Sequence, residues 1–197
     1  MAANSFPDVP IHHRGKRSAI VRALARWFLS INGWKVSGTL PEHRRFIVVA
    51  GPHTSNWDFV YGLSAAVAMN LDIHWLGKNT LFKPPLRRLM YWLGGIPVDR
   101  SNPAGVVEQV AARIREAGDM ALIITPEGTR GKVKKWKTGF LRIARRSDSV
   151  LVVTSIDFGK KEISLGEVFA VGEDDLADIA FIQGEFSRVT PRNPDDY

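Results

Sequence analysis

The chain has 197 residues, of which 45% are hydrophobic and 24% are charged, a composition typical of one folded globular domain. It contains no cysteine, which excludes disulfides and cysteine nucleophiles, and neither a signal-peptide pattern nor an apolar run of roughly 18 residues is present, so a cytoplasmic protein is expected. The formal net charge of +7 favours acidic partners such as nucleic acid, anionic lipid or a phosphorylated substrate.

The first 33 residues are predicted to form an N-terminal arm and a basic amphipathic helix. Apolar residues recur at helical spacing from Arg14 to Ile31. One face carries Ile20, Leu24, Trp27, Phe28 and Ile31, and another carries Ser18, Arg22 and Arg26. Such a helix either packs on the domain with a solvated basic edge or lies in an anionic membrane interface. The pattern alone favours the packed helix.

The remaining elements alternate between strands and helices. Apolar or β-branched runs predict strands at residues 34–38, 46–50, 73–76, 96–98, 120–125 and 150–156, and residues 161–165 alternate as an edge strand would. Helices are predicted from caps at 54–56 to about residue 69, and at 81–92, 103–117, 138–146 and 173–186. This order predicts a single α/β domain over residues 34–189, with a mostly parallel central sheet flanked by helices. Residues 190–197 are expected to form a mobile tail.

The stretch FIVVAGPHTSNWD, residues 46–58, places His53 and Asp58 where a predicted strand gives way to a helix. The Gly51-Pro52 break puts His53 in the loop and Asp58 on the helix, so that the two side chains can meet. A carboxylate held against one imidazole nitrogen fixes the tautomer and leaves the other nitrogen free to take a proton. Taken alone, such a pair is more often a cap or a surface contact than a catalytic dyad.

Three further stretches follow predicted strands at the edge where open α/β sheets place their sites. They are Gly77-Lys78-Asn79, GGIPVDR at residues 94–100 and PEGTR at residues 126–130. They bring cations at Lys78, Arg100 and Arg130, and a carboxylate at Glu127, toward His53. Each also has a structural interpretation as a turn or a surface ion pair. Together they favour a phosphate-binding site, because the planar arginine fork makes two parallel hydrogen bonds to a phosphate.

HTSNWD, GGIPVDR and PEGTR, in this order, resemble the first three motifs of the glycerolipid acyltransferases, the lysophosphatidic acid acyltransferase group, over about residues 34–158. The resemblance implies an α/β acyltransferase fold. It also implies transfer of a fatty acyl group from an acyl-coenzyme A or acyl-carrier-protein thioester to a hydroxyl, with 1-acylglycerol-3-phosphate as the commonest acceptor. It implies that His53 is the general base, that Asp58 orients it and that Arg100 binds the acceptor phosphate. For the third motif, Glu127, Gly128, Thr129 and Arg130, it implies acceptor-binding and structural roles.

The chemistry agrees with this resemblance. A base that removes the hydroxyl proton is worth roughly 10² to 10⁴ in rate. A thioester is already activated, so no metal or cofactor is expected beyond the acyl donor, and backbone N–H groups at the start of the helix are candidates for stabilising the oxyanion. The fourth motif usually contains a proline, which residues 152–155 lack, so the acceptor stays open.

Two other functions compete with acyl transfer. The same His53–Asp58 pair could activate water in a thioesterase, and the positive charge could serve nucleic acid. Lys135 and Lys137 belong to the basic cluster after PEGTR, and they are expected to meet the phosphates of coenzyme A or an acidic carrier protein rather than nucleic acid. A lipid acceptor without a predicted membrane span implies peripheral attachment to the inner face of the membrane, through Trp27, Phe28, Arg22 and Arg26.

Overall fold

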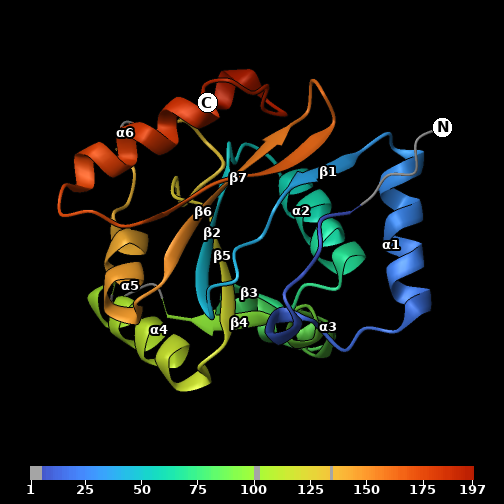
Figure 1. The fold of residues 1–197 in the computed structure, drawn as a ribbon, viewed down its shortest axis with the longest axis horizontal. Coiled ribbons are helices and arrows are strands. Elements are labelled where there is room, and N and C mark those ends of the chain that lie inside the picture. Colours follow the sequence, from blue (N-terminus) through green and yellow to red (C-terminus); the bar gives the residue numbers. More distant parts are fainter. Residues whose placement is uncertain (1–5, 100–102, 134) are drawn as a thin grey trace.

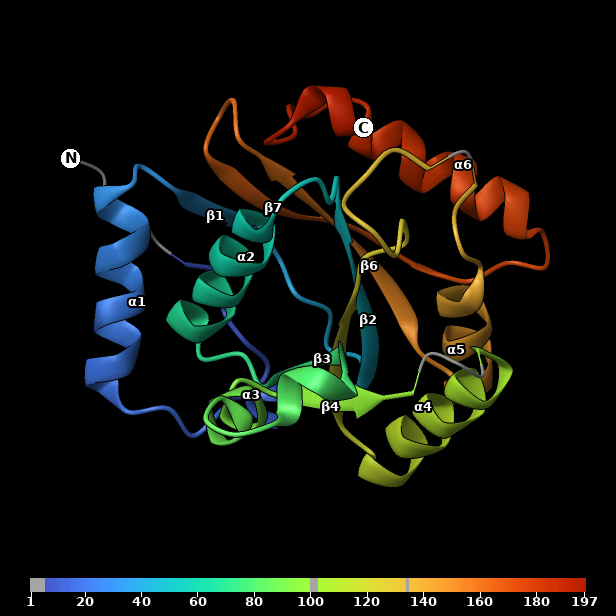
Figure 2. The same ribbon diagram turned by 180° about the vertical axis from the view of Figure 1, so that it is seen from behind.

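A seven-stranded β-sheet in the strand order β1-β7-β6-β2-β5-β3-β4 runs through the middle of the molecule (Figures 1 and 2). The computed structural model describes residues 6–99, 103–133 and 135–197. The strands are β1 (Lys35–Gly38), β2 (Arg45–Gly51), β3 (Ile73–Lys78), β4 (Gly95–Val98), β5 (Met120–Ile124), β6 (Val150–Asp157) and β7 (Glu162–Ala170). Neighbouring strands are parallel except β6 and β7, which are antiparallel.

Helices cover both faces of the sheet. They are α1 (Ala19–Ile31), α2 (Asn56–Met69), α3 (Arg87–Trp92), α4 (Pro103–Ala117), α5 (Gly139–Ser147) and α6 (Asp175–Phe186). Helices α1 and α2 lie on one face, and α4, α5 and α6 lie on the other (Figure 1). No helix in the described ranges is both long and apolar enough to cross a membrane.

Strand β2 is buried on both faces, which explains its unbroken apolar sequence. Phe46, Val48 and Ala50 pack in the same core cluster as α1 and α2, whereas Ile47 and Val49 pack in the cluster with α4, α5 and α6. Strand β2 pairs in parallel with both β5 and β6, so the carboxyl ends of all three strands meet at one edge. The predicted α/β fold with a mostly parallel sheet is confirmed.

The prediction that residues 161–165 form an edge strand is wrong. Strand β7 lies between β1 and β6, and the edges of the sheet are β1 and β4. The alternation arises because Ile163 and Leu165 are buried while their neighbours in the sequence are less so. Alternation therefore reports which face of a strand is buried and not how many neighbours the strand has.

Two helix boundaries also differ from the prediction. The segment expected to be helical at residues 81–92 is a short 3₁₀ turn, Asn79–Phe82, followed by α3 from Arg87. Pro84 and Pro85 separate the two, because proline lacks an N–H and disfavours helical geometry in the residue before it. The first helix begins at Ala19 and not at Arg14, with the Ser18 hydroxyl accepting from the Val21 N–H at 3.3 Å.

The described part of the N-terminal arm packs against the domain. Val9 and His13 are both buried. The His13 ring hydrogen-bonds through Nε2 to the carbonyl of His43 at 2.9 Å. These contacts place the arm against the same side of the molecule as α1 and α2 (Figure 2).

Candidate active site

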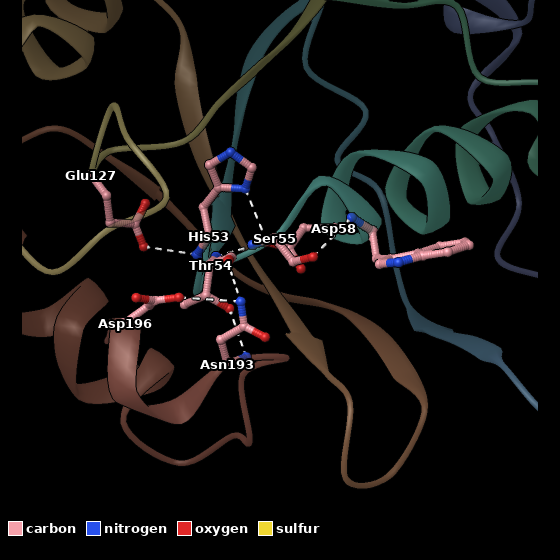
Figure 3. Close-up of polar contacts among 8 residues, drawn as sticks. His53, Thr54, Ser55, Asp58, Glu127, Asn193 and Asp196 are labelled. Atoms are coloured by element: carbon pink, nitrogen blue, oxygen red, sulfur yellow. Dashed lines mark hydrogen bonds and ion pairs between the residues drawn. The ribbon is translucent and has the colours of Figure 1, made fainter.

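His53 and Asp58 meet at the carboxyl edge of the sheet, as the sequence predicts. His53 lies in the loop after β2 and Asp58 in the first turn of α2, with 3.0 Å between His53 Nδ1 and Asp58 Oδ2 (Figure 3). The His53 side chain is 16% exposed and that of Asp58 only 2%. Against a carboxylate, Nδ1 carries the proton and donates it, which leaves Nε2 as a proton acceptor.

The Asp58 carboxylate holds the backbone of the histidine loop as well as the ring. Its Oδ2 atom accepts from the N–H groups of Thr54 and Ser55, both at 2.8 Å, and the bond from Ser55 completes a capping box at the start of α2. The Trp57 N–H donates to Ser55 Oγ at 3.2 Å. These three N–H groups are occupied within the motif. The expectation that backbone N–H groups at this helix start stabilise an oxyanion is therefore wrong for Thr54, Ser55 and Trp57.

Glu127, in the loop after β5, supports the loop that carries His53. The residue is buried, and its Oε1 atom accepts from the His53 N–H at 3.2 Å. Oε2 is buried without a hydrogen-bond partner among the described residues. Burial raises the pKa of the Glu127 carboxyl above its usual range, although the hydrogen bond from the His53 N–H opposes that shift. The sequence predicts that Glu127 binds substrate, and in the structure one of its oxygens accepts a hydrogen bond from the backbone of the loop that carries His53.

The last residues of the chain contact this loop, which sequence reasoning missed. The Asn193 N–H donates to Thr54 Oγ1 at 3.1 Å, and Asn193 Nδ2 donates to the Thr54 carbonyl at 3.0 Å. In Figure 3 the His53 ring projects to one side of the loop, and Asn193 and Asp196 lie on the other. The Phe158 N–H donates to the Thr190 carbonyl at 2.8 Å, which joins the tail to the end of β6. Residues 190–197, expected to be mobile, thus make specific contacts.

A pocket of about 290 Å³ opens beside His53 and Glu127. Its wall combines the loop after β5, the end of α6 and the tail, and its other lining residues are Gly131, Lys132, Val133, Trp136, Gln183, Ser187, Asp196 and Tyr197. Burial, reinforced by the charge of Glu127, raises the pKa of Tyr197 to about 12, so this phenol stays protonated at neutral pH. The lining of the pocket therefore includes aromatic side chains and a protonated phenol hydroxyl.

The other predicted site residues that the structure describes make no bond to this pair. Lys78, Thr129, Arg130, Lys135 and Lys137 are exposed, and none has a hydrogen bond or ion pair to His53 or Asp58 among the described residues. Gly128 has a positive φ of 67°, and a Cβ there would lie 3.2 Å from the Lys137 side chain. Arg100, the predicted ligand of the acceptor phosphate, lies outside the described residues.

Close packing behind the loop also constrains its sequence. Gly51 ends β2, and a Cβ there would lie 2.3 Å from the Phe186 ring of α6. A side chain at position 51 would displace either α6 or the loop that carries His53. The arrangement as a whole offers a histidine base with a fixed tautomer, a buried orienting carboxylate and an adjoining pocket, which suits removal of a proton from a hydroxyl or from water.

Comparison with known proteins agrees with this geometry. The family model described as "Acyltransferase" matches residues 34–157. The chain is similar to two curated 1-acyl-sn-glycerol-3-phosphate acyltransferases, with 28% identity to that of Limnanthes douglasii and 34% to that of Limnanthes alba. Each match extends over 138 residues, which is 68% of this chain and 48% of the relative, so the chain spans about half the length of these relatives.

The fold is also similar to a solved structure, that of the 1-acyl-sn-glycerophosphate (LPA) acyltransferase PlsC from Thermotoga maritima. The TM-score is 0.63, and the match covers 86% of this chain and 76% of the other. The sequences are 18% identical, so this likeness supports the shared fold.

Proposed function

The chain belongs to the acyltransferase family, and we propose that it moves a fatty acyl group from a thioester to a hydroxyl of a lysophospholipid-type acceptor, with His53 as the general base. The donor is acyl-coenzyme A or an acyl-carrier protein, and 1-acylglycerol-3-phosphate is the first candidate acceptor. The observation that carries this proposal is the 3.0 Å contact between His53 Nδ1 and Asp58 Oδ2, which leaves Nε2 as the proton-accepting atom of a histidine that borders a pocket.

In the proposed reaction, Nε2 takes the hydroxyl proton while the hydroxyl oxygen attacks the thioester carbonyl carbon. The C–S bond of the resulting tetrahedral intermediate then breaks, and the imidazolium returns its proton to the departing thiolate. Asp58 stabilises the transient imidazolium through Nδ1, and its burial keeps water from competing for that bond. No covalent acyl-enzyme is needed, because the thioester is already activated.

Acceptor recognition is proposed for the cations of the motif loops. We assign Lys78, Arg100 and Arg130 to the acceptor phosphate, because guanidinium and ammonium groups bind phosphate by charge-assisted hydrogen bonds. The exposure of Lys78 and Arg130 supports this assignment, and so do the names of the two curated relatives, whose acceptor carries a phosphate. Glu127 is proposed to act indirectly, through the backbone of His53.

The donor is proposed to approach over the loop after β5. Lys135 and Lys137 are exposed there and supply positive charge for the phosphates of coenzyme A or the acidic surface of a carrier protein. The Lys137 side chain lies over Gly128, and Gly128 belongs to the third motif. The donor and acceptor sites would therefore share this loop.

Contact with a membrane surface is proposed for α1. Ile20, Leu24, Trp27 and Ile31 are 72%, 58%, 61% and 59% exposed, so the apolar face of the helix points to solvent. An apolar helical face of this kind lies naturally at the boundary between headgroups and acyl chains. Phe28 is partly buried and stacks on Tyr61, so it lies away from this face. Arg26 Nε donates to the Ala68 carbonyl at 3.0 Å, but the residue is exposed and stays a candidate for attraction to anionic headgroups. Because a lipid acceptor lies in the membrane, we propose that the enzyme binds the inner face of a membrane.

The deciding experiment supplies radiolabelled acyl-coenzyme A and acyl-carrier protein with a panel of hydroxyl lipids and identifies the product. We expect an acylated lipid whose formation requires the acceptor, and a fall of roughly 10² to 10⁴ in kcat for His53→Ala. A matched control is His12→Ala, because His12 is exposed and lies far from the site in the sequence. Release of free fatty acid at an undiminished rate without acceptor would identify a thioesterase instead. Near-native turnover by the folded His53 variant would exclude the general-base assignment.

A further inference from the structure

A second pocket, of about 330 Å³, lies at the opposite end of α2 from the catalytic pair. Its wall is formed by the arm at residues 6–9, by arginines at positions 14, 22 and 26, and by Met69 and Asn70 at the end of α2. Twelve residues of α2 separate Asp58 from Asn70, which is about 18 Å at 1.5 Å per residue. This pocket, here termed the arginine pocket, is therefore distinct from the catalytic site.

The arginine pocket has an excess of positive charge. Arg14, Arg22 and Arg26 line it, and Asp8 is the single acidic residue among its described lining residues. None of the ion pairs in the described part of the chain includes any of these three arginines. Arg22 and Arg26 also lie one turn apart on α1, where like charges repel each other.

The existing contacts of the arginines leave most of their donors free. Arg14 Nε donates to the Val9 carbonyl at 2.9 Å and Arg26 Nε donates to the Ala68 carbonyl at 3.0 Å. These bonds orient the two guanidinium groups and leave their terminal nitrogens without a described hydrogen bond. Arg22 Nε is buried and has no hydrogen-bond partner among the described residues. A buried, unpaired donor beside a cavity is costly, and a hydrogen-bond acceptor that enters the cavity would satisfy it.

The partial negative charge at the carboxyl end of α2 neutralises only part of the positive charge of the arginines. The helix dipole favours cations there, and Arg26 and Arg17 each donate to a carbonyl at that end, Ala68 and Leu71. Arg14 and Arg22 donate to none of these carbonyls. The fractional negative charge of one helix end does not balance three guanidinium groups, so the pocket remains suited to an anion.

We propose that the arginine pocket binds a phosphate group. Guanidinium groups bind phosphate through pairs of parallel N–H···O bonds, and arginines from both the arm and α1 reach the pocket. The phosphate comes either from an anionic lipid headgroup or from free phosphate in solution. The proposal does not depend on acyl transfer, because none of the pocket residues belongs to the catalytic site.

The test follows the Nε–Hε NMR signals of arginine in the intact protein. In the first arm, inorganic phosphate is added, and we expect saturable shifts of the Arg22 and Arg26 signals. The Arg22→Gln variant should bind phosphate about tenfold more weakly, as the Arg26 signal reports, because a charged hydrogen-bonding partner is lost. The control is Arg142→Gln, which removes one positive charge from an exposed position on α5. This control should bind phosphate as the parent does.

In the second arm, sedimentation with phosphatidylcholine vesicles is measured with and without phosphatidylglycerol. A lipid source predicts that Arg22→Gln loses binding to the anionic vesicles relative to Arg142→Gln, which has the same net charge. A free-phosphate source predicts saturable phosphate shifts and equal vesicle binding by the two variants. Circular dichroism checks the fold, and Arg22→Lys should recover part of the affinity. If Arg22→Gln and Arg142→Gln match the parent in both arms, the arginine pocket is not a phosphate site.

Discussion

The backbone around His53 is held from three directions by residues far apart in the sequence. Asp58 binds the ring and two N–H groups, Glu127 accepts from the His53 N–H, and Asn193 binds Thr54 at two atoms. A general base gains most when its position is fixed before the substrate arrives, because small displacements cost large factors in rate. The tail and the third motif therefore act on the same loop as the orienting carboxylate.

Glu127 should make the stability of the fold depend on pH. Its pKa is raised in the folded protein from an ordinary value of 4.5, because burial disfavours the carboxylate. Between that ordinary value and the raised one, the folded state binds more protons than the unfolded state. This group therefore lowers stability as the pH rises through that window.

The corresponding measurement compares the parent with Glu127→Gln, whose amide oxygen can still accept from the His53 N–H. The difference in melting temperature, variant minus parent, should increase as the pH rises above 4.5 and then level off, by a few degrees in all for about 1 kcal/mol. Glu167→Gln is the control, because Glu167 is exposed. A difference that stays constant with pH would show that the carboxylate has no unfavourable charge in the folded state.

Asn193 should affect catalysis although it makes no hydrogen bond to the His53 ring among the described residues. Replacing it with alanine removes the hydrogen bond from its side-chain amide to the Thr54 carbonyl. The hydrogen bond from its backbone N–H to Thr54 Oγ1 can persist. We expect kcat to fall about tenfold with little change in KM, since a loosened loop costs about 1.4 kcal/mol of positioning. Amide exchange at Thr54 and Ser55 should become faster in the same variant. Asp195→Ala changes an exposed residue of the same segment and should leave both quantities unchanged.

Among the helices, α1 differs from an ordinary amphipathic surface helix because several of its large apolar side chains face solvent. Leu29 is fully buried against the domain, Arg22 lines the arginine pocket, and Trp27 on the outer face is 61% exposed. Exposed apolar side chains gathered on one helix face mark an interaction surface. The free energy of a helix with this orientation falls when its outer face enters a lipid interface, because the apolar side chains leave water.

Vesicle sedimentation tests this role of α1. Leu24→Ser/Trp27→Ser should reduce binding to vesicles by about tenfold or more, because each buried apolar side chain contributes roughly 1.5–3 kcal/mol. Leu176→Ser/Phe181→Ser on α6 is the matched control, since it removes two exposed apolar side chains from another helix. Circular dichroism should show both double variants folded. Equal loss by the two would indicate a nonspecific change in solubility and no role for α1.

Local patterns predicted most elements, and the failures have identifiable causes. The bounds of α4 and the carboxylate–imidazole pairing follow from short-range signals: helix periodicity and the Gly51-Pro52 break. The position of β7 between two strands depends on its partner β1, more than 120 residues away, and no local pattern carries that information. The sequence left open whether the apolar face of α1 packs on the domain or faces outward, because periodicity identifies two faces without saying which one the domain covers.

The contact between the tail and the loop that carries His53 could not be predicted from local patterns either. A segment rich in proline and aspartate reads as a mobile tail, yet Asn193 reaches a threonine 139 positions away. The sequence feature behind this contact is one asparagine in a polar stretch. Asparagine is also common in solvated tails, so it does not distinguish a docked segment from a mobile one. Motif residues such as His53 were found because their order and spacing are specific, and the residues that support them have no such signature.

The whole molecule has a positive net charge, and part of it lies in the loop after β5. The net charge is +7, and exposed lysines at 135 and 137 lie beside the third motif. A field of this sign increases the rate at which negatively charged substrates reach the site and has little effect on the chemical step. Both proposed donors carry negative charge, as coenzyme A phosphates or as the acidic surface of a carrier protein.

Ionic strength should therefore change KM for the donor more than kcat. Raising it from about 0.01 M to 1 M shortens the Debye length from roughly 30 Å to 3 Å, so the attraction is lost beyond direct contacts. Lys135→Glu/Lys137→Glu should raise the donor KM about tenfold at low salt and flatten its salt dependence. Arg113→Glu/Arg142→Glu on α4 and α5 changes the net charge equally and should keep most of that dependence. If both double variants respond to salt alike, the net charge of the molecule attracts the donor and the loop after β5 has no specific part in binding it.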